Sequence, residues 1–283
     1  MLLEIKKVSK TYKKKKVLDN ISLSLSEGVY GFLGPNGAGK TTLIGIITGL
    51  IPMDLGSVSY TDGEHNVLND TLGFLPQYQN FYGNFSAEEM LRYMMCLKNF
   101  TPENPKEYIC ELLEKVNLQD CGNKKIKTFS GGMKQRLGIA QALINDPNVI
   151  IFDEPTAGLD PKERIRFRNI ISSLGKNKIV ILATHIVTDV AYVAKEVILL
   201  NKGRIVYADT QKKLTDKIYG KVWQYKCSGE TVSDIINNFS VSNILAEDDG
   251  FSVRMISDEK PFEDAVSVIP NLDDVCLYFF GEI

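Results

Sequence analysis

Gly34-Pro35-Asn36-Gly37-Ala38-Gly39-Lys40-Thr41-Thr42 is the stretch that decides the fold of this chain. It fits the pattern G-x-x-x-x-G-K-[ST], whose glycines let the backbone curl until its N–H groups can face phosphate oxygens. Lys40 can reach the outer phosphates as a cation, and the Thr41 hydroxyl suits Mg²⁺. The loop therefore predicts binding of a nucleoside triphosphate together with Mg²⁺.

The segments on either side of the loop fit the same prediction. Val29–Leu33 reads as a short buried strand, and after the loop apolar residues recur at helical spacing, at Leu43, Ile46, Ile47 and Leu50. A strand, a glycine-rich loop and a helix in this order aim the N-terminus of the helix at an anion. We therefore expect a phosphate-binding loop rather than a chance match.

Composition indicates a soluble globular protein of one large or two unequal domains. Of its 283 residues, 44% are apolar and 24% are charged, which is ordinary for such proteins. A net charge of −2 gives no indication of binding to nucleic acid. The longest apolar runs are far shorter than the roughly 18 residues of a membrane helix, so we expect any membrane role to require a partner. The five scattered cysteines read as reduced thiols in a cytosolic protein.

The order of predicted elements indicates an α/β core with a parallel sheet. Period-two alternation predicts antiparallel strands at Leu3–Val8 and Ile21–Leu25, with Lys13–Lys16 as a solvated turn between them. Strands that alternate with helices are typical of a parallel sheet, and the later strands are Val149–Asp153, Lys178–Thr184 and Val197–Leu200. Helices interrupt this alternation, so residues 78–146 are predicted to form an inserted helical subdomain.

Capping residues mark the starts of three predicted helices. Ser86-Ala87-Glu88-Glu89 has the spacing of a capping box. Asp160-Pro161 fits the N-cap and first position of a helix. Ser130-Gly131-Gly132 precedes a third helix, in which Ser130 can cap the first turn while the following N–H groups offer an anion site.

The tail after the core, residues 217–283, is predicted to be a small α+β domain. Its expected elements are strands at Val222–Cys227, Val241–Ala246, Phe251–Met255 and Val275–Phe280, and helices at Thr231–Phe239 and Pro261–Ile269. The order β-α-β-β-α-β is that of a ferredoxin-like fold. Because fold does not imply function, the hypotheses for the tail are dimerisation, regulation or simple packing.

Two carboxylates follow the apolar strand Val149–Phe152. A strand that ends in Asp153-Glu154 places both residues at the carboxyl edge of the sheet, where α/β proteins bind ligands. Adjacent residues on a strand point in opposite directions, so they can take different roles. Asp153 can hold Mg²⁺, directly or through water, and Glu154 can face the attacking water as a general base.

With these residues in place, the chain resembles the nucleotide-binding subunits of ABC transporters. Phe129-Ser130-Gly131-Gly132-Met133 resembles the family signature L-S-G-G-Q, with Phe in place of Leu and Met in place of Gln. The remaining matches stand in the family's order over residues 1–210: Tyr12 for the adenine-stacking aromatic, Gln77 for the Q-loop, Ala157-Gly158-Leu159-Asp160 for the D-loop, and His185 for the switch histidine. The other histidine, His65, reads as a surface loop residue. The resemblance implies a P-loop ATPase core with a RecA-like parallel sheet, an antiparallel β subdomain and a helical subdomain within residues 1–216.

The resemblance also implies a division of roles. In this family the signature contacts the γ-phosphate bound by the other subunit, so two ATP molecules lie in the interface of a head-to-tail dimer. His185 donates to the γ-phosphate or orients the water of Glu154, and Gln77 senses Mg²⁺ and links to the membrane partner. The predicted sites are therefore catalytic Glu154 and His185; ATP-binding Tyr12, Gly34, Pro35, Asn36, Gly37, Ala38, Gly39, Lys40, Thr41, Thr42 and Gln77; Mg²⁺-binding Thr41, Gln77 and Asp153; Ser130, Gly131 and Gly132 in trans; and Asp160 in the D-loop.

We therefore expect an ATPase subunit that powers transport at the cytoplasmic face of a membrane. Its expected partners are permease subunits on separate chains and a second ATPase subunit, identical or different. Gly28–Gly34 and the tail after Arg204 resemble the drug, bacteriocin and lantibiotic export branch, which suggests export. The alternatives are an ABC ATPase that acts on ribosomes or DNA, and a regulatory nucleotide-binding module with little turnover. ABC ATPases that act on ribosomes or DNA tend to have two fused ATPase units or a long coiled-coil insertion, whereas this sequence has one phosphate loop and no sustained heptads. Asp153-Glu154 together with His185 argues against a degenerate site, and so against a module with little turnover.

Overall fold

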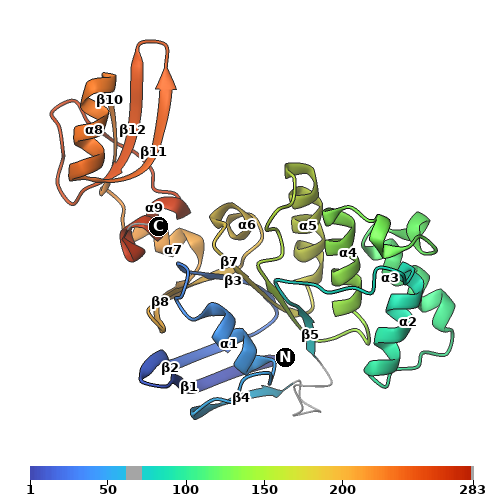
Figure 1. Ribbon diagram of the computed structural model, residues 1–283. Coiled ribbons are helices and arrows are strands. Elements are labelled where there is room, and N and C mark those ends of the chain that lie inside the picture. The colour runs from blue at the N-terminus through green and yellow to red at the C-terminus, as the bar shows by residue number, and fades with distance from the viewer. Residues whose placement is uncertain (62–71, 282–283) are drawn as a thin grey trace.

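The computed structural model describes residues 1–61 and 72–281, so His65 lies outside the described residues. Figure 1 shows a main body built on a central sheet, a helical arm beside it, and a separate strand-rich unit near the C-terminus. Among the described residues, no helix has the length and apolarity that a membrane span requires.

The central sheet has six strands in the order β5-β6-β7-β3-β8-β9. Neighbours are parallel except for β9, which pairs antiparallel with β8. The strands are β3 (Gly28–Leu33), β5 (Leu72–Leu75), β6 (Val149–Asp153), β7 (Ile179–Thr184), β8 (Glu196–Asn201) and β9 (Arg204–Asp209). β3, β6 and β7 are buried along their whole length. Their continuous apolar runs are what a parallel sheet with both faces covered requires.

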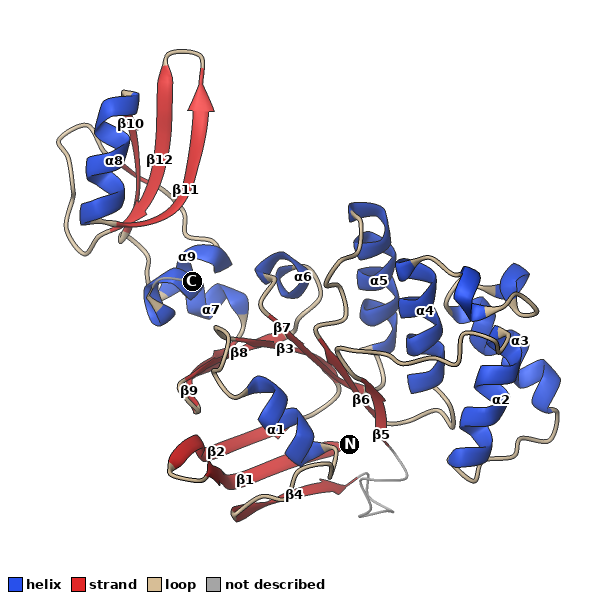
Figure 2. Cartoon of the chain, in the orientation of Figure 1, coloured by secondary structure: helices blue, strands red, loops and turns tan. Residues whose placement is uncertain are grey.

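A second, antiparallel sheet covers one face of the central sheet. Its strands are β1 (Leu2–Tyr12), β2 (Lys15–Leu25) and β4 (Leu55–Thr61), in the order β2-β1-β4. Helix α1 (Lys40–Ile47) lies between the two sheets (Figure 2), and Ile5, Ile44 and Ile181 belong to the one apolar cluster that joins them. The sequence predicted β1 and β2 but not β4, since Tyr60 is the only buried residue of that strand and the periodic signal is weak.

Helices cover the other face and form the arm. They are α2 (Ala87–Leu97), α3 (Pro105–Lys115), α4 (Gly131–Ala142) and α5 (Pro161–Leu174), with short 3₁₀ turns at Gln119–Cys121 and Ile126–Thr128. The predicted capping box of α2 is confirmed, because Ser86 Oγ accepts from Glu89 N at 3.1 Å while Glu89 Oε2 accepts from Ser86 N at 2.6 Å. Asp160 caps α5 as predicted.

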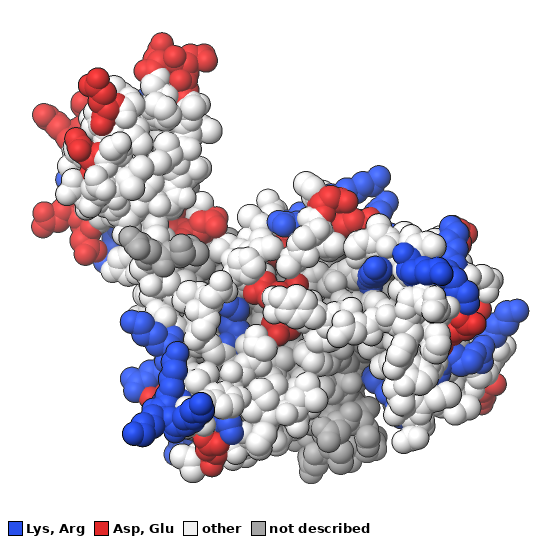
Figure 3. Space-filling model, in the orientation of Figure 1, with Lys and Arg blue, Asp and Glu red and all other residues white. Residues whose placement is uncertain are grey.

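The accessory unit, residues 222–267, is a four-stranded antiparallel sheet with one helix. Its elements are β10 (Val222–Cys227), α8 (Gly229–Asn238), β11 (Ser240–Glu247), β12 (Gly250–Ile256) and β13 (Val266–Ser267), in the sheet order β11-β12-β10-β13. Val253 and Met255 on β12 pack against Ile235 of α8. Figure 3 shows acidic side chains gathered on this unit, and a surface of that charge repels polyanions.

Two predictions for the tail are wrong. The predicted helix over Pro261–Ile269 is a turn followed by β13, and the predicted strand over Val275–Phe280 is helix α9 (Leu272–Phe280). β10 and β11 flank β12 as in a split βαβ unit. Among the described residues, however, no helix lies between β12 and β13, where a ferredoxin-like fold has its second helix. The next helix, α9, follows β13 and begins at a capping box formed by Asn271 and Asp274.

Helix α9 packs on the main body rather than completing the accessory sheet. Its buried residues Leu272, Val275 and Cys276 belong to the apolar cluster that includes Val190 and Leu214. Those two residues lie on α6 (Val187–Ala191) and α7 (Gln211–Asp216), which α9 contacts. Residues 272–280 therefore share the core of the main body, although the predicted division at residue 217 groups them with the tail.

Leu272→Ala should lower the stability of the main body itself. Leu272 is 2% exposed in the shared cluster, and truncation of a buried leucine costs about 2–5 kcal/mol. Thermal unfolding of the full chain checks this, with Ile269→Ala as the control because Ile269 is 80% exposed. An unchanged unfolding midpoint for Leu272→Ala would contradict the shared core.

Candidate active site

The phosphate loop lies between the end of β3 and the start of α1. Gly39 has φ of 109°, a conformation open to glycine, and this residue turns the chain into the helix that Lys40 begins. A Cβ at Gly34 would lie 2.2 Å from the carbonyl oxygen of Leu200, so no larger residue fits there. These two glycines fix the path of the loop around the helix N-terminus, which favours an anion.

Lys40 lies inside the loop. Its Nζ donates to the carbonyl oxygens of Gly34 at 2.5 Å and Pro35 at 3.3 Å, and the side chain is buried. Burial lowers the pKa of the Lys40 ammonium, and the charges of Glu154 and Asp153 raise it in part. The cation is thus held inside the loop by two carbonyl oxygens and within electrostatic reach of the two carboxylates.

Asp153 and Thr41 form an oxygen-rich corner that suits Mg²⁺. Asp153 ends β6, is 3% exposed and shares a hydrogen bond with the side chain of Thr41. Burial raises the pKa of Asp153, which the Thr41 contact lowers in part. Its Oδ1 is buried without a hydrogen-bond partner in the part of the chain that the structure describes. A hydroxyl beside an unpartnered carboxylate oxygen fits a hard cation that takes few protein ligands.

Glu154 faces the same cavity from the next position. Its Oε2 accepts from Thr184 Oγ1 at 3.1 Å and lies 2.9 Å from Nδ1 of His185, whose side chain is 54% exposed. Glu154 has φ of 47°, an uncommon value for a residue other than glycine, and strained backbone of this kind clusters at functional sites. The carboxylate is therefore fixed in direction by two neighbours and by its own backbone.

A cavity of about 180 Å³ brings most of the predicted residues together. Its lining consists of Val17, Asn36, Gly37, Ala38, Gly39, Lys40, Thr41, Thr42, Gln77 and Glu154. Gln77 reaches the cavity from the end of β5. Sequence reasoning missed Val17, which β2 places against the loop, and Thr184, which orients Glu154. Tyr12 is exposed at the end of β1 and is outside this lining, so its stacking on adenine stays a prediction.

The signature residues lie apart from this cavity. Ser130 caps α4 by accepting from Met133 N at 3.2 Å. A Cβ at Gly131 would meet no atom within 4 Å, whereas Gly132 is backed by Glu163. Glu163, a residue that sequence reasoning missed, is paired with Arg136 of α4 at 3.2 Å. Glu163 thus packs against the signature at Gly132, while a side chain at Gly131 would meet no neighbour in the described chain. The predicted contact in trans requires such an accessible side.

The D-loop is held at both ends. Asp160 accepts from Glu163 N at 2.9 Å as the cap of α5. At the other end, the buried Thr156 hydroxyl donates to the carboxylate of Asp189. Asp189 lies on α6, the helix that begins just after His185. Asp189 carried no sequence signal of its own, but its partner Thr156 directly follows the predicted strand end. These contacts link the loops that bear Glu154 and His185.

Asp153→Asn should stabilise the free protein while removing its response to Mg²⁺. Because burial raises the folded-state pKa of Asp153, the charge destabilises the folded state at neutral pH, and this cost fades as the pH falls from the raised folded-state pKa to the unfolded-state pKa. The melting temperature at pH 7 without Mg²⁺ should therefore rise in the variant, and added Mg²⁺ with ATP should no longer raise it as in wild type. Asp248→Asn, on the exposed hairpin, is the control; a lower melting temperature for Asp153→Asn would refute the argument.

Comparison with known proteins gives consistent matches. The family model described as "ABC transporter" matches residues 18–157. The uncharacterized ABC transporter ATP-binding protein YxlF of Bacillus subtilis is 35% identical over 214 residues, 75% of this chain and 72% of the relative. The linearmycin resistance ATP-binding protein LnrL of the same organism is 33% identical over 225 residues (77% and 72%). The lantibiotic transport ATP-binding protein SrtF of Streptococcus pyogenes is 34% identical over 208 residues (72% and 89%).

Solved structures agree with these relatives. The bacterial ABC transporter cassette MJ0796, solved as a dimer, has a TM-score of 0.66 and 26% identity over 74% of this chain and 98% of its own. A dimeric post-hydrolysis state of the same cassette, bound to ADP and Pi, gives the same values.

Proposed function

This chain belongs to the ABC transporter ATP-binding proteins, and from that premise we propose that it powers export through a permease on separate chains. Its reaction is the hydrolysis of ATP. The observation that carries the proposal is Glu154, held by Thr184 and His185 beside Lys40 and Thr41. A module that only binds nucleotide needs no such carboxylate.

The chemistry follows from the placement of these groups. Backbone N–H groups of Gly37–Lys40 and the ammonium of Lys40 neutralise the phosphates, while Thr41 and Asp153 would hold Mg²⁺, which supplies further positive charge when bound. Glu154 accepts a proton from the attacking water while the oxygen of that water bonds to the γ-phosphorus. The bond between the γ-phosphorus and the oxygen that bridges it to the β-phosphate breaks, and ADP leaves. His185, through Nδ1, fixes the direction of Glu154, and its exposed ring can donate to the γ-phosphate.

The open face of the signature supports a head-to-tail dimer. Ser130 and Gly131 are exposed, and the N-terminus of α4 offers unpaired N–H groups to an anion. In the proposed dimer this anion is the γ-phosphate held by the partner's loop. A dimer is the form in which the related cassette MJ0796 was solved, and the same arrangement would give this chain two ATP sites.

Aromatic residues next to Gln77 support docking of a permease. Tyr78 is 79% exposed, and Tyr82 is 55% exposed while its ring contacts Phe85 and Tyr93 at centroid distances of 5.2 and 5.7 Å. Exposed aromatic side chains are enriched where proteins associate. Gln79 Nε2 donates to Gln135 Oε1 on α4 at 2.8 Å, so a partner that displaces this loop also displaces the signature helix.

The names of two relatives support the direction and substrate class. LnrL is a linearmycin resistance protein and SrtF a lantibiotic transport protein. The first name states resistance to a compound, and the second states transport of one. Export of an antibiotic-like compound at the cytoplasmic face of the membrane is therefore our proposal for this chain.

Glu154→Gln should separate ATP binding from transport. The variant keeps the hydrogen bond to Thr184 but cannot take a proton, so hydrolysis should fall by about 10²–10⁴-fold while ATP affinity is retained and the dimer stays closed. The measurement uses wild type and variant reconstituted with the co-encoded membrane protein in vesicles, recording ATP turnover and movement of candidate antibiotics. Glu103→Gln, an exposed glutamate on the arm, is the control. Normal turnover in Glu154→Gln would remove it as the base, and turnover without movement of any compound would refute export.

A further inference from the structure

Helix α9 forms one wall of a second cavity at the phosphate loop. This cavity, about 330 Å³, lies between Gly34, Pro35, Asn36 and His185 on one side and Cys276 and Phe280 of α9 on the other. Burial raises the pKa of the Cys276 thiol to about 12, so this wall is uncharged. The C-terminal helix thus faces the back of the loop and the switch histidine across a space into which either can move.

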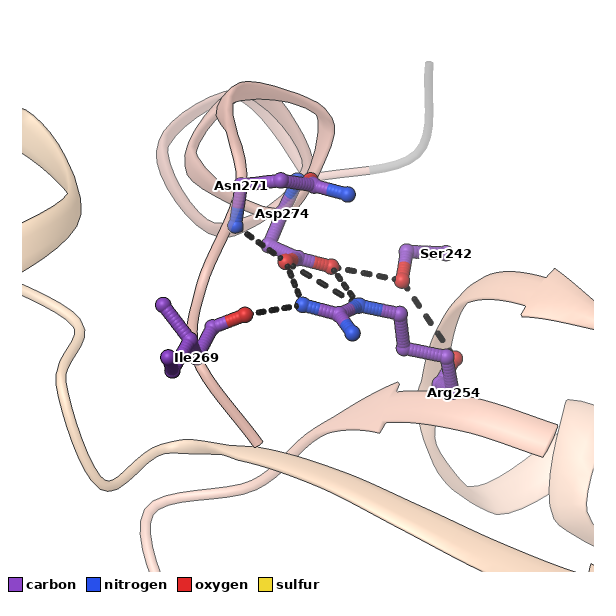
Figure 4. A network of polar contacts seen from close by, with 5 residues as sticks. All are labelled: Ser242, Arg254, Ile269, Asn271 and Asp274. Carbon is purple, nitrogen blue, oxygen red and sulfur yellow. Dashed lines mark hydrogen bonds and ion pairs between the residues drawn. The ribbon is translucent and has the colours of Figure 1, made fainter. Parts of the chain in front are cut away.

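At its other end α9 is fixed to the accessory sheet. Asp274, 0% exposed, accepts from Arg254 of β12 through Nε at 3.1 Å and Nη2 at 2.7 Å. The Ser242 hydroxyl of β11 donates to the same carboxylate at 2.7 Å. Asn271 N donates to it at 2.8 Å, which starts the helix. Figure 4 shows these groups converging on Asp274, with Arg254 Nη2 also donating to the Ile269 carbonyl at 2.6 Å.

These two ends differ in stiffness. To separate Arg254 from Asp274 would leave a buried carboxylate without its counter-charge, which is strongly unfavourable. The accessory sheet is therefore firmly attached to α9, so a displacement of α9 is transmitted to the sheet. At the loop end, by contrast, Phe280 is half-buried beside a cavity, and contacts across a void are weak. A shift of the loop or of His185 is therefore most easily taken up at the Phe280 end of α9, as a small tilt of the helix, while Leu272 and Val275 stay packed in the core of the main body.

We propose that α9 is a positioning element for the phosphate loop and His185, and that the Arg254–Asp274 pair makes the accessory unit sense and adjust their state. The inference rests on the proposed function, because it takes the loop and His185 to respond to ATP. Cys276 and Phe280 act on nucleotide through the loop and do not touch it. The role of the accessory unit is then to couple to the ATP site through α9.

The chain carries its own probe of this coupling. Trp223 is the single tryptophan, and it lies on β10, where its Nε1 donates to the Ser257 carbonyl at 3.1 Å. The preceding residue, Val222, belongs to the same apolar cluster as α9. The same cluster contains Leu214 of α7 in the main body. A tilt of α9 that shifts the attached accessory sheet against the main body therefore changes the surroundings of Trp223, which lies outside both cavities.

The test measures Trp223 emission of the full chain while Mg-ATP is added. ATP affinity is measured separately with a fluorescent ATP analogue. Wild type should show a saturable emission change at the ATP concentrations that the binding assay gives. Arg254→Gln and Phe280→Ala should still bind ATP but lose most of that change, and the KM for ATP or kcat should shift by at least about fivefold, the lower end of usual coupling between sites. Arg254→Lys, which keeps the charge, should recover part of both.

The matched control is Lys226→Gln, which breaks an exposed ion pair with Glu247 on the same sheet and leaves α9 untouched. Circular dichroism confirms folding of each variant, and Phe280→Ala decides the matter if Arg254→Gln unfolds, because Phe280 is only half-buried. ATP binding by wild type with silent Trp223, or an unaltered emission change in folded Phe280→Ala, overturns the coupling alone. Absence of ATP binding by wild type overturns the proposed function, and the coupling with it.

Discussion

Parallel pairing of β3, β6 and β7 is the constraint on which the site depends. Leu33 at the end of β3 pairs with Thr184 at the end of β7, and Asp153 at the end of β6 pairs with Ala183. This register brings three chain segments to one edge of the sheet: the phosphate loop, the two carboxylates and His185. Because side chains alternate between the two faces along a strand, slipping the register by one residue would turn every side chain to the other face. The core therefore sets the distances within the site.

The same edge of the sheet holds the buried charges of Lys40 and Asp153, which destabilise the folded chain when no ligand is bound. Burial lowers the pKa of Lys40 and raises that of Asp153, so each group is less stable in its charged form than it would be in water. Phosphates and a divalent cation are the groups that compensate both charges. These shifts fit a main body that binds ATP, with Mg²⁺ as the proposed cation, and the uncommon backbone conformation of Glu154 lies at the same site.

Much of this arrangement could be predicted from the sequence, because the signals are local. β6 runs over Val149–Asp153 as predicted, and Ser86 and Asp160 cap their helices as predicted. The residues gathered around Lys40 follow from a motif that fixes its own backbone. Glu163, Thr184 and Asp189 could not be found this way, since their roles arise from contacts between elements far apart in the chain.

The errors in the tail have a physical cause. Val275–Phe280 is rich in residues that favour strands, which outweighed the capping box at Asn271 and Asp274. The spacing of Leu272, Val275 and Cys276 is that of one helix face, but only the main body supplies the surface that buries it. Packing against a distant partner decided between helix and strand. For the same reason, the contacts of Arg254 and Ser242 with Asp274 could not be predicted from the sequence.

The central claim is that each ATP site is divided between two copies of the chain, and complementation tests it directly. Lys40→Ala disables the loop, and Gly131→Asp places a negative charge on the open face of the signature, where a side chain meets no neighbour within the chain. Each variant alone should hydrolyse almost no ATP. A mixture of the two, unfolded together and refolded or co-expressed, should recover hydrolysis, because the mixed dimer contains one site with both Lys40 and Gly131 intact. A mixture as inactive as the separate variants, while mixed dimers are present by mass, would contradict the divided site.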